Sequence, residues 1–135
     1  MKKIVLIFIL TVQLFSMDWL KYNEALDIKD LVRKPLFIMV GSNNCKFCNK
    51  FKEKVENNKS FQDYLNGYFL PVYINKDREI LPDNLMTPVT PMFFIVDYKS
   101  MKLLVDPAVG NQPLDKMFDW LDKVSKVVNK LQGDF

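Results

Sequence analysis

The sequence predicts one α/β domain in which a central mixed sheet is flanked by helices. Two apolar runs, at 36–40 and 92–96, carry this prediction because uninterrupted apolar runs of this length are typical of buried strands. Segments with the apolar spacing of helices lie before and after the first run and at the end of the chain. We therefore expect the order helix, strand, helices, strand, hairpin, helix.

The first helix is predicted to begin at a cap on Asp18 and to run to about Val32. It ends before Pro35, because the residue before a proline disfavours helical backbone. The run at 36–40 lies between Pro35 and Gly41, and its apolar character on both faces places it at the centre of the sheet.

A second helix is predicted from about Cys45 to about Glu56, because Ser42, Asn43 and Asn44 are strong capping residues. Apolar side chains spaced by four residues should turn one of its faces inward. They are Phe47, Phe51 and Val55.

The middle of the chain predicts a short helix, an edge strand and an irregular connection. The helix opens at Ser60 and is closed by Gly67, and the strand at 68–74 contains Pro71, which favours an edge or a bulge. The connection at 75–91 has no sustained period and room for at most one helical turn.

The last third predicts a hairpin and a closing helix. The strand at 92–96 is followed by a turn at 97–100 and a partner strand at 101–105. Pro113 suits the first turn of the last helix, where its missing N–H costs nothing. The residues expected on the inward face of that helix are Leu114, Met117, Leu121, Val124, Val128 and Leu131.

Residues 1–16 have the pattern of a secretory signal, with two lysines ahead of an apolar stretch, so we expect 17–135 to be the mature domain. The apolar stretch at 4–15 would span roughly 18 Å as a helix, well short of the ~30 Å hydrocarbon core of a bilayer. Cleavage removes two lysines and no acid, so the formal net charge falls from +3 to +1, and we expect no nucleic-acid partner. Of the two positions that flank the cleavage site only Ser16 is small, so an uncleaved membrane anchor is the alternative.

Cys45 and Cys48 are the only cysteines, and the chain has no histidine. A closed zinc site takes about four nitrogen or sulfur ligands, so we expect no metal. Side chains three residues apart share a helical face, so the two sulfurs can meet as a dithiol/disulfide pair. A permanent structural disulfide is the alternative, but closing so short a loop constrains the unfolded chain little.

The chain resembles the thioredoxin-like superfamily, particularly its small exported members. A buried strand leads into a helix that opens with Cys-Lys-Phe-Cys at 45–48, Thr90-Pro91 directly precedes the strand at 92–96, and Gly110 precedes the closing helix. Further upstream, the residues similar to the exported branch are Trp19, Glu24-Ala25-Leu26 and Lys34-Pro35. The resemblance covers most of 18–131 and implies a thioredoxin-like fold with thiol–disulfide oxidoreductase activity.

The motif allows roles to be assigned to its four residues. Cys45, at a helix N-terminus with lysines nearby, lies where the thiolate is favoured and is the expected nucleophile. Cys48, one turn deeper, is the expected resolving thiol. Lys46 and Phe47 lie between the cysteines and are expected to tune the reduction potential.

The resemblance also implies a substrate-binding turn at Thr90 and Pro91. Pro91 is expected to be cis and to face the dithiol, which leaves the backbone of Thr90 available for pairing with an extended substrate. Two departures from the family are visible. Met39 stands where thioredoxins commonly bury an acid. The connection at 75–89 is short and has at most one helical turn where the family has a crossover helix, although a parallel crossover of a dozen or more residues could still be irregular at this length.

Together these features predict an exported, periplasmic thiol–disulfide oxidoreductase that reduces protein disulfides. We expect it to be a monomer without a cofactor and to be recharged by a thiol donor in the membrane or periplasm. The alternatives are a redox-inactive thioredoxin-fold module that binds peptides beside Thr90 and Pro91, and a membrane-anchored assembly factor facing the periplasm.

Overall fold

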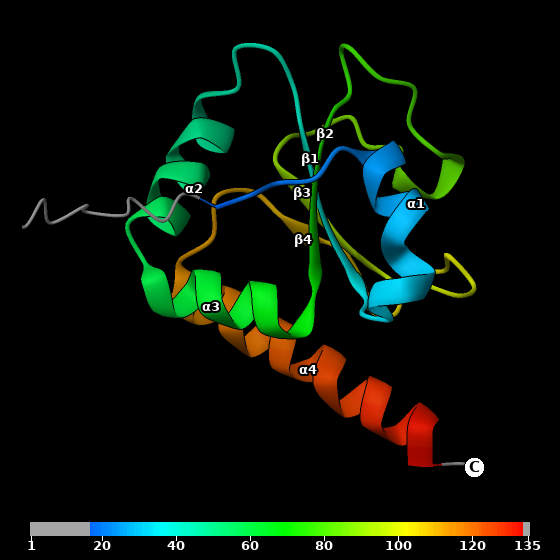
Figure 1. Ribbon diagram of the computed structural model, residues 1–135. Helices are drawn as coiled ribbons and strands as arrows, with labels where there is room; N and C mark the ends of the chain where they lie inside the picture. Colours follow the sequence, from blue (N-terminus) through cyan, green and yellow to red (C-terminus); the bar gives the residue numbers. More distant parts are fainter. Residues whose placement is uncertain (1–16, 134–135) are drawn as a thin grey trace, which may run out of the picture.

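The computed structural model describes residues 17–133, and the α/β class with a central mixed sheet is confirmed (Figure 1). The predicted signal at 1–16 lies outside the described residues. The elements in chain order are α1 (Tyr22–Val32), β1 (Leu36–Gly41), α2 (Lys46–Glu56), α3 (Lys59–Tyr68), β2 (Leu70–Asn75), the 3₁₀ turn η1 (Asp83–Leu85), β3 (Met92–Val96), β4 (Ala108–Val109) and α4 (Leu114–Gly133).

The strands lie in the order β2-β1-β3-β4, with β1 parallel to β2 and antiparallel to β3. β1 is therefore an inner strand and β2, which carries Pro71, is an edge strand, as the sequence predicted. α2 and α3 supply the crossover that the parallel pair requires. β2 and β3 run in opposite directions, so the expectation of a parallel crossover in the connection between them was wrong, and a connection without an α-helix suffices.

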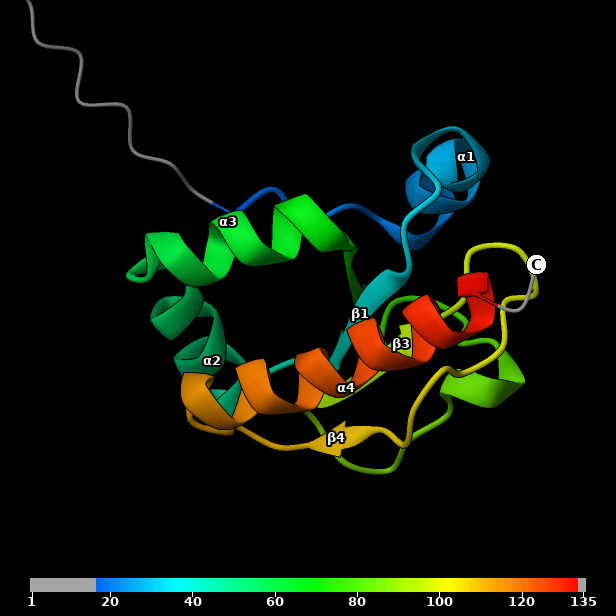
Figure 2. The ribbon, with the colours of Figure 1, turned by 90° about the horizontal axis from the view of Figure 1, so that it is seen from below.

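Helices cover both faces of the sheet (Figures 1 and 2). Because side chains alternate along a strand, Leu36, Ile38 and Val40 of β1 pack in one cluster with residues of α1 and η1. Phe37 and Met39 face the opposite side and pack with α2, α3 and α4. The second face carries the larger aromatic core and also holds the cysteines.

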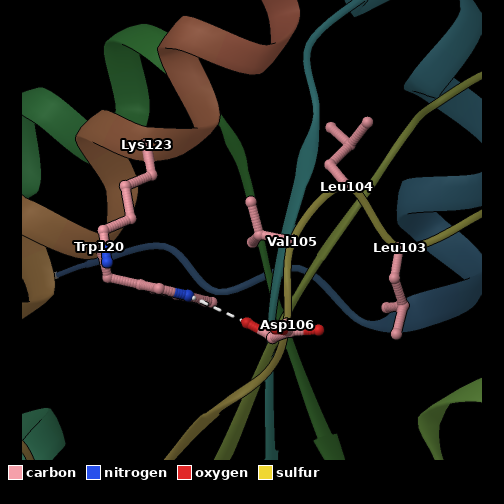
Figure 3. Close-up of a pocket in the computed structure, with 6 residues that line it drawn as sticks. All are labelled: Leu103, Leu104, Val105, Asp106, Trp120 and Lys123. Carbon is pink, nitrogen blue, oxygen red and sulfur yellow. Dashed lines mark hydrogen bonds between the residues drawn. The ribbon is translucent and has the colours of Figure 1, made fainter.

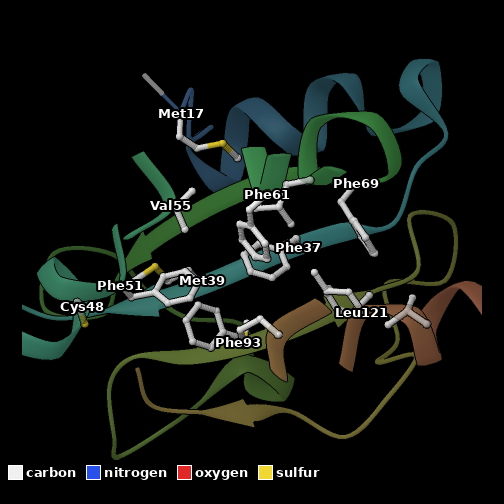
Figure 4. Close-up of a cluster of buried hydrophobic side chains, with 14 residues drawn as sticks. Met17, Phe37, Met39, Cys48, Phe51, Val55, Phe61, Phe69, Phe93 and Leu121 are labelled. Atoms are coloured by element: carbon white, nitrogen blue, oxygen red, sulfur yellow. The ribbon is translucent and has the colours of Figure 1, made fainter. Parts of the chain in front are cut away.

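This core is built from aromatic rings in edge and tilted contacts (Figure 4). The Phe93 ring centroid lies 4.5 Å from that of Phe51 and 5.7 Å from that of Phe37, so α2 packs directly onto β3, whose Phe93 also contacts β1. Cys48 belongs to the same buried cluster. The start of α2 is thus held by the core and not by its disulfide alone.

The first helix begins at Tyr22 and not after the predicted cap on Asp18. The residues before it are extended along the edge of β2. The N–H of Leu20 donates to the carbonyl of Pro71 at 3.0 Å, and the carbonyl of Leu20 accepts from the N–H of Tyr73 at 3.0 Å. Backbone pairing with an open strand edge therefore outweighs the capping preference of Asp18.

The third helix is capped by Asn58 and not by Ser60, because the Asn58 side chain accepts a hydrogen bond from the N–H of Phe61 at 2.9 Å. Gly67 lies inside this helix and does not close it, so the following strand begins later than the predicted Tyr68. Asparagine and serine are both good caps, and the sequence alone did not separate them.

The predicted hairpin partner at 101–105 is interrupted. Leu103 forms a single bridge to Val96, and pairing resumes only at β4, beside the start of β3. Pro107, which has no N–H to donate, lies in the interruption. The predicted turn is confirmed, with the Asp97 carboxylate accepting from the N–H and the hydroxyl of Ser100 at 2.8 Å each.

The last helix follows Pro113 as predicted and buries Met117, Leu121 and Val124. Leu131 was expected on the inward face but is 54% exposed. The end of α4 runs beyond the sheet (Figure 1), so the periodic pattern continues where Leu131 only lines an open hollow beside Pro35 and Tyr98. Among residues 17–133, no helix is both long and apolar enough to cross a bilayer.

Candidate functional site

Cys45 and Cys48 form a disulfide at the start of α2, with their Cα atoms 5.2 Å apart. Cys45 is the N-cap residue itself, and its Sγ accepts a hydrogen bond from the N–H of Cys48 at 3.1 Å. The cap was expected from Ser42, Asn43 or Asn44, so that prediction was wrong. Cys45 is partly exposed, whereas only 1% of Cys48 is accessible.

The chain between β1 and α2 is a turn tied to the end of β2. Asn44 has a left-handed backbone with φ 54°, a conformation that asparagine adopts more readily than most residues. The N–H of Asn43 donates to the Asp77 carboxylate at 2.7 Å, and the Asn43 side chain accepts from the Asn75 amide at 3.0 Å. These bonds hold the turn that delivers Cys45 to the surface.

Thr90 lies against Cys45, so the structure brings these two predicted site residues together, and Pro91 is the next residue in the chain. The Thr90 hydroxyl is 3.4 Å from the Sγ of Cys45 and is oriented to donate to it. The Ser42 hydroxyl lies 2.7 Å from that of Thr90. The Thr90–Pro91 peptide bond is cis, as predicted, and Pro91 is buried.

The loop before Pro91 has no α-helix but is extensively hydrogen-bonded. The Lys76 ammonium donates to the carbonyls of Thr87 and Pro88 at 3.3 and 3.4 Å. The Thr87 hydroxyl donates to the Val89 carbonyl at 2.8 Å and accepts from the Val89 N–H at 3.2 Å. The side chains of Lys76 and Thr87 thus hold this part of the connection between β2 and β3, which contains no α-helix.

Exposed apolar side chains occur in all three segments that build the site. Phe47, between the cysteines, is 57% exposed, and Val89, beside Thr90, is 47% exposed. Val109 is 48% exposed, and the next residue, Gly110, donates its N–H to the Pro91 carbonyl at 2.8 Å. Apolar surface beside a disulfide suits contact with a peptide chain.

Lys46 and Phe47 both point away from the core, so the inward face of α2 does not begin at Phe47 as its spacing suggested. It begins at Cys48 and continues through Phe51 and Val55, which are buried. The ammonium of Lys50 lies 5.7 Å from the centre of the Phe47 ring, a cation–π distance.

The core around Cys48 is apolar. Met39 is fully buried in the same cluster as Cys48 and leaves the position of the usual buried acid without a carboxylate. Within the described part of the chain, no three histidine, cysteine or acidic side chains gather to hold a metal ion. The groups that the structure gathers at this site are the two sulfurs and the hydroxyls of Thr90 and Ser42.

A separate hollow of about 500 Å³ lies between the segment before β4 and the helix α4 (Figure 3). The indole N–H of Trp120 donates to the carbonyl of Asp106 at 3.0 Å inside it. Leu104 and Lys123 also line the hollow, but it shares no lining residue with the disulfide site.

Sequence reasoning missed three residues of the site. Ser42 was interpreted only as a cap, and Val89 and Val109 were not singled out. A signal existed for Val89, which directly precedes Thr90-Pro91 in an irregular segment where an apolar residue has no core to join. No comparable signal identified Ser42 or Val109, because their positions depend on the tertiary fold.

Comparison with known families decides the classification of the chain. The family model of the thioredoxin-like domain matches residues 22–125, which is well over half of the sequence. The chain belongs to the thioredoxin-like domain family. An uncharacterised protein of Archaeoglobus fulgidus is 29% identical over 84 residues, which cover 58% of this chain and 66% of that protein, just under two thirds of its length.

Solved structures share the fold of this thioredoxin-like chain. A thioredoxin from Thermus thermophilus matches with a TM-score of 0.67 and 20% identity, over 82% of this chain and 88% of that one. A thioredoxin-fold protein from Helicobacter pylori matches with a TM-score of 0.57 and 19% identity, over 76% and 82% of the two chains. A DsbH oxidoreductase matches with a TM-score of 0.55 and 15% identity, over 85% and 86%. A thioredoxin-like fold with a Cys-x-x-Cys disulfide supports thiol–disulfide oxidoreductase activity.

Proposed function

We propose that this chain is an exported thiol–disulfide oxidoreductase that reduces disulfides in proteins. The observation that carries the proposal is the asymmetry of the Cys45–Cys48 pair. Cys45 is partly exposed at a helix N-terminus beside Thr90, and Cys48 is buried one turn deeper. A permanent disulfide staple does not need one accessible sulfur and one shielded sulfur.

The reaction exchanges one disulfide for another. The Cys45 thiolate attacks one sulfur of the substrate disulfide, which forms a mixed disulfide and releases the other substrate sulfur as a thiolate that takes a proton from water. The Cys48 thiolate then attacks the Sγ of Cys45 and releases the second substrate thiol. Two electrons pass from the dithiol to the substrate, and the Cys45–Cys48 disulfide remains.

The order of attack follows from the surroundings of each sulfur. The unpaired N–H groups at the start of α2 and the positive end of its dipole favour the thiolate of Cys45. Apolar burial disfavours the charged form of Cys48, and the core lacks the usual acid near it. We therefore propose that water reaching the mixed disulfide accepts the Cys48 proton during the resolving step.

Substrate is proposed to bind as an extended segment against the backbone of Thr90, as an added strand. The exposed side chains of Phe47, Val89 and Val109 would contact apolar residues on either side of the substrate cysteine. We propose that Lys46 and Phe47, the two residues between the cysteines, tune the reduction potential.

Reduction requires an external source of electrons. The chain has a single cysteine pair, so its disulfide must be reduced after each turnover by a dithiol donor that is not part of this chain. The proposed site of action is the periplasm, with the protein monomeric and the donor in the membrane or periplasm. Support for export comes from the sequence pattern at 1–16. The intact mass of the protein recovered from cells tests it, and a full-length chain in the membrane fraction would instead support an anchor.

The activity is tested by reduction of insulin disulfides with dithiothreitol as the thiol donor. The wild-type chain should accelerate insulin precipitation, and Cys45→Ser should abolish the acceleration. Cys48→Ser should accumulate a mixed disulfide with insulin, because attack remains possible while the resolving thiol is gone.

Cys45→Ser is the matched control for this trapping experiment, because it leaves one cysteine of the same pair in place. Equal trapping by both variants would refute the assigned order of attack. A folded wild-type chain with no effect on insulin and no trapping by Cys48→Ser would favour a binding module over an enzyme.

A further inference from the structure

Two hydroxyl groups connect the end of β1 to the sulfur of Cys45. The Ser42 and Thr90 oxygens are 2.7 Å apart, and the Thr90 hydroxyl is 3.4 Å from the Sγ of Cys45, within the reach of a hydrogen bond to sulfur. Both residues are partly buried. Ser42 does not cap α2, because Cys45 is the N-cap residue of that helix.

Proton counting fixes the direction of this chain of hydrogen bonds. A hydroxyl has one proton to donate, and Thr90 directs its proton at the Cys45 sulfur. When both bonds form at the same time, the bond between the two hydroxyls is donated by Ser42 and accepted by Thr90. Serial donation polarises the second hydroxyl, which strengthens its bond to the sulfur.

The bond becomes more important when Cys45 is reduced and ionised. A disulfide sulfur is a weak acceptor, whereas a thiolate carries a full charge, and hydrogen bonds to charged groups are about twice as strong as neutral ones. Donation to the ionised form stabilises that form. Partial burial of both residues limits competition from water.

We propose that Ser42 and Thr90 form a hydroxyl relay that stabilises the thiolate of Cys45, with Thr90 acting on the sulfur and Ser42 positioning and polarising Thr90. This inference rests on the proposed function, because it concerns the same sulfur. The relay acts when Cys45 attacks a substrate disulfide and again when the dithiol donor displaces Cys45 as a thiolate. A more stable thiolate leaves faster and is present in a larger fraction at neutral pH.

The test is the pH dependence of iodoacetamide alkylation of reduced protein, with Cys45 identified by peptide mass. Thr90→Val keeps the shape and removes the hydroxyl, and it should move the alkylation midpoint to higher pH. At a pH below both midpoints, the thiolate fraction should fall about tenfold. Thr90→Ser retains a hydroxyl and should keep the wild-type midpoint.

Ser42→Ala should shift the midpoint in the same direction by a smaller amount, because the donor to sulfur remains but is no longer polarised. The double variant Ser42→Ala/Thr90→Val should match Thr90→Val alone, since Ser42 acts only through Thr90. Ser100→Ala, which removes a hydroxyl bonded to Asp97 in a distant turn, is the control and should leave the midpoint unchanged.

If Thr90→Val and the wild-type chain have the same alkylation midpoint, the relay is overturned, whatever the pH of that midpoint. Additive shifts from Ser42→Ala and Thr90→Val would overturn the serial arrangement. These outcomes are separable from the proposed function. Trapping of insulin by Cys48→Ser with an unmoved midpoint overturns the relay alone, and a shifted midpoint without any trapping supports the relay while overturning the reductase.

Discussion

Replacing Gly41 with alanine is expected to lower the free energy of unfolding by about 1–3 kcal/mol through overpacking. Gly41 ends β1, and Tyr73 on β2 lies diagonally beside it, because the register pairs Tyr73 with Met39. A methyl group at Gly41 would lie 2.8 Å from Cε2 and 2.9 Å from Cζ of the Tyr73 ring and would collide with its hydroxyl oxygen. Favourable carbon contacts need about 3.5–4.0 Å.

Displacing the Tyr73 ring to make room for the methyl group costs free energy. The ammonium of Lys52, on α2, lies 3.3 Å from the ring centre. Burial raises the pKa of the Tyr73 hydroxyl and lowers the pKa of the Lys52 ammonium, which indicates that water is partly excluded from the pair. Moving the ring would weaken a cation–π contact of about 0.5–2 kcal/mol, which supplies much of the expected loss.

The assay is urea unfolding of the four proteins of a double-mutant cycle made with Gly41→Ala and Tyr73→Ala. In the Tyr73→Ala background the methyl group has room, and Gly41 does not have a positive φ, so alanine should be neutral or stabilising by about 0.4–1 kcal/mol. An equal penalty for Gly41→Ala in both backgrounds would show that the methyl group does not meet Tyr73, and the reasoning would be refuted.

Three further perturbations have contrasting expected results. Leu121→Ala should cost about 2–5 kcal/mol in urea unfolding, whereas Leu131→Ala on the exposed end of the same helix should stay within about 0.5 kcal/mol. Burial alone would raise the pKa of the Asp97 carboxyl, but hydrogen bonds from Ser100 hold that pKa below its ordinary value. The resulting stability is present above the unfolded-state pKa and is lost as pH falls through the folded-state pKa, so Ser100→Ala should destabilise at neutral pH and match wild type in strong acid. Lys76→Met removes the ammonium that holds two loop carbonyls and should slow insulin reduction while lowering the unfolding free energy by only about 1 kcal/mol; a wild-type rate would contradict its role in holding the loop.

Most of the fold could be predicted because its centre is strongly patterned. The strand at 36–40 is apolar on both faces, and only an inner strand covered by helices can bury it. The predicted helix cap at Asp18 was wrong because a capping preference worth about 1 kcal/mol competes with the backbone pairing of Leu20 along β2. That pairing is a tertiary contact, and no local sequence pattern indicates it. The prediction that Leu131 is buried was wrong because periodicity does not indicate where the surface that covers a helix ends.

In the candidate site, too, the residues in local motifs could be predicted and those that depend on tertiary contacts could not. Cys45 and Cys48 could be located because the motif and the preceding strand are contiguous, and Thr90-Pro91 because it adjoins a second strand. Ser42 could not be assigned its place beside Thr90, since the two lie 48 residues apart and meet only because β1 and β3 are neighbours. Contacts across strands depend on register, and a shift of one residue would point Ser42 away from the site.

The pairing of Leu20 with β2 also bears on aggregation. Along the outer side of β2, the carbonyl of Pro71 and the N–H of Tyr73 are occupied by Leu20, and the N–H of Asn75 donates to the Glu79 carboxylate at 3.2 Å. At the opposite edge β4 is only two residues long, and its last carbonyl accepts from the Gln112 amide at 2.8 Å. Neither edge offers a long row of unpaired groups on which a second chain could add as a strand. For the proposed reductase, contact with an extended substrate would then be confined to the disulfide and the short turn at Thr90, so that the substrate would be free to leave once exchange is complete.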